Sequence, residues 1–316
     1  MRHEGAAPAR TGASTGRGKR EAPRVEEIEV RTRDGWSLRT DVREPAEAPV
    51  GVAVLAHAFM ARRTQFDRPK DAGFARFLVG LGWRVVAFDF RAHGDSGPLA
   101  QQGGEYGYDD LVRSDMPAIC AFARSRARAR LPLIVVGHSL GGHVALAAQG
   151  TGAIDVDGVV GFGASPWIRE LEPSRPRWMI KRAVLAAALG VARRVGRLPS
   201  RALGRGSDDE PRVCVEDFGR FARTGAWMSA DGRSDYLASL ARVRVPVLGV
   251  VSDGDRLECV PACGERLLAR TGGPQAVVRI ERRDDGSPPP GHMGLLTSGR
   301  VRRAWTDVEG WMRNVG

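Results

Sequence analysis

Lysine is almost absent from this chain of 316 residues, which contains only Lys19, Lys70 and Lys181. Arginine supplies the other 45 of its 48 basic residues, and the formal net charge is +11. This imbalance, beside abundant alanine and glycine, indicates codon bias, so the charge is weak support for a nucleic-acid site. Residues 1–24 alone contribute +4, from six basic side chains and two glutamates. We therefore expect the folded body to bind no nucleic acid.

Long apolar runs and patterned cysteines are missing too. No stretch reaches the roughly 20 apolar residues of a membrane span, and residues 1–24 lack the apolar core of a signal peptide. The four cysteines, Cys120, Cys214, Cys259 and Cys263, show no spacing typical of secreted scaffolds. These absences predict a cytoplasmic protein. For Cys259 and Cys263 we favour buried apolar positions over a metal pair or redox switch.

Composition divides the chain into a tail and a body. Residues 1–24 are rich in Gly, Ala, Ser, Thr, Pro and Arg without apolar periodicity, which predicts a disordered basic tail. The chain is 42% hydrophobic and 27% charged, as is ordinary for a soluble enzyme. We therefore expect residues 25–316 to form one folded domain.

Strand and helix patterns alternate along most of this body. An Asp34-Gly35 turn joins two strands at its start, and the later apolar runs are continuous, as in strands buried on both faces. This order predicts an α/β fold with a mostly parallel sheet, helices on both faces and an antiparallel edge. The expected strands are 25–33, 36–43, 50–56, 84–90, 133–136, 156–162, 245–251 and 276–281, and the expected helices are 71–81, 108–128, 143–149, 260–270 and 301–313.

The alternation stops between about residues 165 and 240, which predicts an inserted helical cap over the site. Its one clear element is an amphipathic helix near residues 177–194, where an apolar stripe lies beside several arginines. Such a stripe would suit an acyl chain with an anionic head, or contact with a membrane surface. Packing of the stripe on the core, with solvated arginines, is the interpretation that we favour.

The most informative stretch is Gly137-His138-Ser139-Leu140-Gly141, between the apolar run 131–136 and the small-residue run 143–149. A strand, a sharp turn bearing a serine, and a helix form a nucleophile elbow. Glycines are needed beside the serine because its strained backbone brings these neighbours close to other atoms. We therefore predict that Ser139 is a catalytic nucleophile.

A serine nucleophile needs a histidine base and an acid that orients it. With the chain order serine, acid, histidine, only His292 among the six histidines qualifies as the base. Asp253 and Asp255 both follow the run 245–251, and we favour Asp255 because it lies farther beyond the strand end. Asp253 is then expected to cap the turn.

Attack on a carbonyl also builds an oxyanion, which backbone N–H groups must stabilise. Leu140, directly after the serine, should supply one donor. The loop His57-Ala58-Phe59-Met60 should supply the other through Phe59, although alanine and methionine stand where His-Gly-x-Gly has glycines. We expect His57 to hold this loop by hydrogen bonds and not to transfer protons.

From about residue 26 onward the chain resembles α/β-hydrolases of the serine-aminopeptidase and lysophospholipase-like group. Three segments carry this resemblance, namely the elbow, Asp34-Gly35 and residues 89–96. The last of these is similar to an Asp-x-Arg-Gly-x-Gly-x-Ser loop. Residues 217–221 and 225–227 are also similar to caps of such bacterial proteins. The resemblance implies an α/β-hydrolase fold and supports the triad, but leaves the substrate open.

These observations predict a serine hydrolase that acts on a small-molecule carboxylic ester, including an acyl-lipid, through Ser139, His292 and Asp255, without cofactor or metal. An acyltransferase or thioesterase would use the same triad in a drier site. A third hypothesis is a non-catalytic binding protein whose basic tail contacts nucleic acid or an acidic partner.

Overall fold

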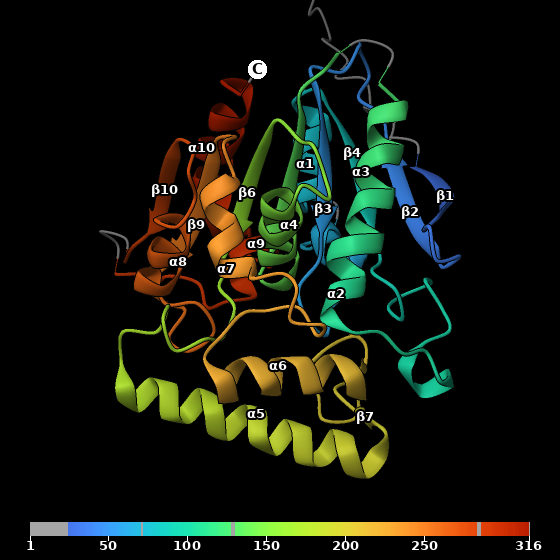
Figure 1. Cartoon of the computed structure of the whole chain (residues 1–316). Coiled ribbons are helices and arrows are strands. Elements are labelled where there is room, and N and C mark those ends of the chain that lie inside the picture. The colour runs from blue at the N-terminus through green and yellow to red at the C-terminus, as the bar shows by residue number, and fades with distance from the viewer. Residues whose placement is uncertain (1–24, 71, 128–129, 283–285, 316) are drawn as a thin grey trace, which may run out of the picture.

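The computed structural model describes residues 25–70, 72–127, 130–282 and 286–315. Its centre is an eight-stranded sheet with the order β1-β2-β4-β3-β5-β6-β9-β10 (Figure 1). β1 pairs antiparallel with β2, and β2 with β4, whereas all other neighbours are parallel. The predicted mostly parallel sheet with an antiparallel edge is confirmed.

The strands of this sheet lie within one or two residues of the predicted ends. They are β1 (Val25–Arg31), β2 (Ser37–Arg43), β3 (Gly51–Ala56), β4 (Trp83–Phe88), β5 (Leu133–His138), β6 (Gly158–Phe162), β9 (Val247–Ser252) and β10 (Gln275–Ile280). The helices are α1 (Phe74–Gly80), α2 (Tyr108–Asp110), α3 (Met116–Ser125), α4 (Leu140–Thr151), α5 (Arg175–Val195), α6 (Arg212–Thr224), α7 (Tyr236–Ser239), α8 (Pro261–Leu268), α9 (Gly294–Thr297) and α10 (Arg302–Arg313).

Helices cover both faces of the sheet and form two hydrophobic cores with it. On one face Ile119 of α3 and Val144 of α4 pack with side chains of β3 and β5. On the other face Phe74 of α1 and Trp305 of α10 pack with the alternate side chains of the same strands. Every residue of β3, β5, β6 and β9 is buried, which explains their continuous apolar sequence.

The helix predicted over residues 108–128 is present, although it is not a regular α-helix throughout. It comprises α2, a π-helical turn at Leu111–Asp115, and α3. Pro117, which has no N–H to donate, directly follows this π-helical turn. The predicted ends Asp71 and Arg128 and the predicted tail 1–24 lie outside the described residues.

Between β6 and β9 the chain adds helices at one end of the sheet, which we call the cap. Within it, α5 lies farthest out and α6 lies between α5 and the sheet (Figure 1). The helix expected near residues 177–194 is present as α5. The sequence patterns did not predict α6 or the paired strands β7 (Arg197–Leu198) and β8 (Glu210–Pro211). Gly219 interrupts the sequence pattern of α6, whose formation depends on buried contacts of Cys214 and Phe221 that are distant in sequence.

None of the helices in the described ranges combines the length and the apolar character required to cross a bilayer.

The packing around the elbow makes a stability prediction. A Cβ on Gly141 of α4 would lie 2.2 Å from the Ala56 carbonyl oxygen, whereas a Cβ on Gly310 of α10 would meet nothing within 4 Å. We expect Gly141→Ala to lower the free energy of unfolding by about 1–3 kcal/mol or more. Gly310→Ala should raise it by about 1 kcal/mol. Urea unfolding followed by circular dichroism measures both, and equal effects would contradict the described packing.

Candidate active site

Ser139 lies at the turn between β5 and α4 in a conformation that few residues adopt. Its φ is 50° and its ψ is −111°. Its N–H donates to the Phe162 carbonyl at the end of β6, with an N–O distance of 2.8 Å. A Cβ at Gly137 would lie 2.2 Å from the Gly142 nitrogen, so the flanking glycines are required by close contact. The turn therefore has the geometry of a nucleophile elbow.

His292 and Asp255 are brought together from loops 37 residues apart. The His292 Nδ1 lies 2.5 Å from Asp255 Oδ2, and the carboxylate is buried. Burial by itself would raise the pKa of the Asp255 carboxyl, but the hydrogen bond from His292, and the charge of this ring when it is protonated, hold the pKa below its usual value. Because Nδ1 donates to the carboxylate, Nε2 of the neutral ring is left as the proton acceptor.

Asp253 makes a different contact from the one predicted for it. Its exposed side chain forms an ion pair with Arg279 of β10, with an N–O distance of 2.8 Å, instead of capping the turn. The pairing follows from the parallel register of β9 and β10, which places Arg279 opposite Val251, two residues before Asp253. The loop thus offers one buried and one exposed carboxylate, and only the buried one contacts the imidazole.

The imidazole of His292 lies beside the elbow. Its ring centroid is 5.0 Å from that of His138, the residue before Ser139. His138 Nε2 donates to the His292 carbonyl at 3.2 Å, which ties the histidine loop to the end of β5. A Cβ on Gly163 would lie 2.9 Å from His292 Cε1, so this glycine leaves room for the ring. Among the described residues, Ser139 Oγ has no hydrogen-bond partner, and the role of His292 as its base stays a prediction.

The two predicted oxyanion donors also lie beside the elbow. The Leu140 N–H is at the N-terminus of α4, where helical N–H groups have no intrahelical acceptor. Within the described ranges, neither this group nor the Phe59 N–H donates to a protein acceptor. The Gly141 N–H donates to the His57 carbonyl at 3.1 Å and so fixes the Phe59 loop next to α4.

His57 holds this loop, as the sequence predicts. Its Nδ1 donates to the Ala58 carbonyl at 2.8 Å, and its Nε2 accepts from the Phe90 N–H at 3.0 Å. One nitrogen donates and the other accepts, so the ring is neutral. Burial, and then the nearby His93, lower its pKa well below the usual value. Both ring nitrogens of His57 are thus taken up by backbone groups of this loop and its neighbour.

Glu210 of β8 is a residue of this site that sequence reasoning missed. Its buried Oε1 accepts from the Met60 N–H at 2.5 Å and from His93 Nε2 at 3.1 Å. Met60 has a φ of 59°, at one of the positions where the familiar motif has glycine. A carboxylate from the cap thus holds the strained residue next to Phe59. The pairing of β7 with β8 and the hydrogen bond from the Ser207 N–H to the Met60 carbonyl place it there. Both join segments that are distant in sequence, so no local motif indicates them.

His93 and Glu210 form a buried ion pair. The other ring nitrogen, Nδ1, lies 3.0 Å from the Arg91 carbonyl, so both nitrogens face acceptors and both must carry protons. Burial alone would lower the pKa of His93, but the Glu210 carboxylate and the Arg91 carbonyl outweigh it and raise this pKa to about 9.

All four cysteines are buried, as expected for Cys259 and Cys263. In the part of the chain that the structure describes, no three His, Cys, Asp or Glu side chains gather in a way that could hold a metal ion.

Comparison with known proteins identifies the family. The profile of the family described as serine aminopeptidase, S33, matches residues 70–279, which is more than half of the chain. The chain belongs to this family of α/β-hydrolases. The match includes Ser139 and Asp255 and ends before His292. The search of curated proteins found no match to this chain.

Solved structures show the same fold. An esterase from Exiguobacterium antarcticum has a TM-score of 0.62 and 15% identity over 91% of this chain and all of its own. The esterase domain of a Rhodothermus marinus protein has a TM-score of 0.58 and 19% identity over 93% of this chain and all of its own. A monoacylglycerol lipase from Paleococcus ferrophilus has a TM-score of 0.57 and 16% identity over the same shares.

The His93–Glu210 pair predicts a pH dependence of stability. A histidine whose folded pKa is raised to about 9 from 6.5 stabilises the fold fully below pH 6.5, and this stabilisation is lost as the pH rises through 9. We expect the free energy of unfolding to fall by on the order of 3 kcal/mol across this window. Glu210→Gln should be less stable at pH 7 and should lack most of this fall. Unfolding by urea at a series of pH values measures both proteins, and parallel curves would refute the ion pair.

Proposed function

We propose that this hydrolase cleaves carboxylic esters, with Ser139 as nucleophile, His292 as general base and acid, and Asp255 as the residue that orients the imidazole. The hydrogen bond of 2.5 Å between His292 and Asp255, beside a serine in an elbow conformation, carries the proposal. We further propose that residues 25–316 act as one domain with the cap, about residues 165–240, as an insertion.

In the acylation half of the reaction, Ser139 Oγ attacks the ester carbonyl carbon while its proton passes to His292 Nε2. The carbonyl oxygen becomes an oxyanion that accepts hydrogen bonds from the Phe59 and Leu140 N–H groups. The intermediate collapses, the ester C–O bond breaks, and the leaving alkoxide takes the proton from His292. Asp255 stabilises the imidazolium while it exists and keeps its ring in place.

In the deacylation half, water replaces the alcohol. His292 Nε2 takes a proton from the water, whose oxygen attacks the acyl carbon and forms a second oxyanion at the same two donors. The acyl–oxygen bond to Ser139 breaks, and the proton returns from His292 to the serine oxygen. A carboxylic acid leaves, and the free enzyme is restored. No step needs a metal or an organic cofactor.

The two carboxylates of the Asp253–Asp255 loop provide a matched test. We expect Asp255→Asn to lower kcat/KM for a p-nitrophenyl ester by ~10³- to 10⁴-fold, because the amide favours the wrong imidazole tautomer. Asp253→Asn removes the same charge two residues away and only an exposed ion pair, so its activity should change less than twofold. Equal losses in the two variants would refute the assignment of the acid.

Covalent labelling tests the nucleophile. A fluorophosphonate should label the wild-type protein and not Ser139→Ala, whose kcat should fall by at least ~10³-fold. A p-nitroanilide and an alcohol acceptor, assayed beside the ester, separate ester hydrolysis from peptidase activity and acyl transfer. Labelling of Ser139→Ala, or a folded wild type that is neither labelled nor active on esters from acetyl to long acyl, would refute the proposal.

A further inference from the structure

The outward face of α5 is apolar and has no partner in the described fold. The side chains at helical spacing along it form what we call the outer stripe, namely Met179, Ile180, Ala183, Val184, Ala187, Gly190, Val191 and Val195. Met179 is 58% exposed, Ile180 53% and Val184 45%. Five of the eleven large apolar side chains that are exposed in the described residues lie on this helix. Such a concentration on one face marks a contact surface.

Packing of the cap does not need this stripe. Trp178, Lys181 and Ala192 are the buried residues of α5, and they lie on the opposite side of the helix. Lys181 reaches Glu172 with an N–O distance of 2.9 Å, which anchors the start of α5. The expectation that the apolar stripe packs on the core is therefore wrong for its outer half, since these residues remain exposed.

The charge around the stripe has one sign. α5 contains six basic residues and no acidic residue. Glu172 pairs with Arg177 and Lys181, and Glu216 pairs with Arg193. The other three arginines of α5 have no carboxylate partner within the described ranges, namely Arg175, Arg182 and Arg194. The same holds for Arg223 of α6, the helix that faces α5.

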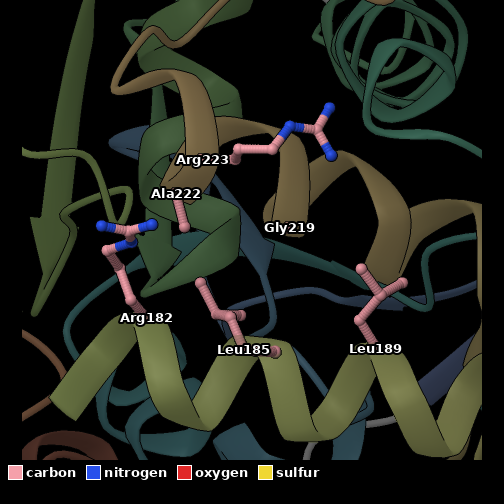
Figure 2. Close-up of a pocket in the computed structure, with 7 residues that line it drawn as sticks. Arg182, Leu185, Leu189, Gly219, Ala222 and Arg223 are labelled. Carbon is pink, nitrogen blue, oxygen red and sulfur yellow. The ribbon is translucent and has the colours of Figure 1, made fainter. Parts of the chain in front are cut away.

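A pocket between the two cap helices combines the same features. It has a volume of about 200 Å³ and an apolar lining that includes Leu185, Leu189 and Ala222. Figure 2 shows Arg182 from α5 and Arg223 from α6 beside these apolar side chains. Because the pocket lies on the side of α5 that faces α6, it is separate from the outer stripe, which lies on the other side of the helix.

The position of α5 allows contact with a plane. It is the outermost element at its end of the molecule and lies across that end (Figure 1). Its 21 residues give a length of about 31 Å at 1.5 Å per residue. Helices that lie in a bilayer interface have an apolar face flanked by arginine or lysine.

We propose that the outer stripe of α5 binds the surface of an anionic lipid bilayer. A second copy of the chain fits the charge poorly, because two such helices would place like charges together. Nucleic acid would use the arginines but would leave the apolar side chains uncovered. An anionic bilayer satisfies both features, since its phosphates pair with guanidinium groups and its acyl region receives Ile180 and Val184.

Docking in this orientation also concerns the active site. Phe218 of α6 contacts Phe59 of the predicted oxyanion loop, with ring centroids 5.0 Å apart. A bilayer against α5 would thus lie on the cap side of the site. The relation of the bilayer to the active site rests on the proposed function, whereas bilayer binding itself does not. Binding is therefore measured on the full-length Ser139→Ala variant, which should not hydrolyse lipid.

The test is co-sedimentation of this protein with vesicles of phosphatidylcholine alone or with 30% phosphatidylglycerol (about a third anionic lipid). We expect binding to the anionic vesicles, at least about tenfold weaker binding to the neutral ones, and weakening with salt. Ile180→Asn with Val184→Asn should reduce binding at least about tenfold. Val50→Asn with Val277→Asn, which changes two valines that are 41% and 44% exposed elsewhere, should leave it unchanged.

Single charge removals complete the test. Arg194→Gln, which removes an exposed arginine one helical turn after Gly190 and Val191 of the outer stripe, should weaken binding about fivefold. Arg303→Gln, which removes an exposed arginine of α10, should have no effect. The proposal is overturned if anionic vesicles are not bound, if neutral vesicles are bound equally, or if the stripe variant binds like its control. The proposal is also overturned if the wild-type protein forms a dimer without lipid and the stripe variant is a monomer. That result would assign the outer stripe to contact with a second copy.

Discussion

The turn at Ser139 is the constraint on which the other parts of the site depend. Three neighbouring residues of this turn each fix a different element: Ser139 N–H binds the end of β6, Gly141 N–H binds the His57 carbonyl, and His138 binds the His292 carbonyl. The backbone of the turn therefore positions the predicted nucleophile, one oxyanion donor and two further loops together. Strain at φ 50° is tolerated because these bonds hold it from three sides.

The cap takes part in this arrangement through a single buried carboxylate. Ala58 and Met60 stand at the two glycine positions of the His-Gly-x-Gly motif. Met60 adopts a positive φ, which costs a glycine less conformational energy. Glu210 accepts the Met60 N–H, and the charged His93 neutralises the carboxylate. Strain in the predicted oxyanion loop is thus offset by a contact that the cap supplies. The contact between Glu210 and Met60 therefore couples the conformation of loop 57–60 to the packing of the cap against the sheet.

The sheet, both helical layers and the His292–Asp255 contact could be predicted from sequence, because each follows from a local pattern or from chain order. Buried strands read as apolar runs, and the elbow is a pentapeptide. Glu210, α6 and the pairing of Asp253 with Arg279 could not be predicted, because each depends on segments that meet only in the fold. The same reason explains why the outer stripe was assigned to the core: periodicity reveals that a helix has an apolar face, but not whether another element covers it.

The formal net charge of +11 does not show which basic side chains can attract an anionic partner, because many of them are paired with carboxylates. Arg63 contacts Asp41, Asp89 and Asp95, and Arg91 contacts Asp34 and Asp115, so these buried arginines support the fold and attract no external partner. Arg175, Arg182 and Arg194 of α5 have no such carboxylate partner among the described residues. A high arginine content that reflects codon usage can therefore still create a functional surface wherever the fold leaves arginines beside exposed apolar side chains. Pairing, and not composition, decides where an anionic partner would bind.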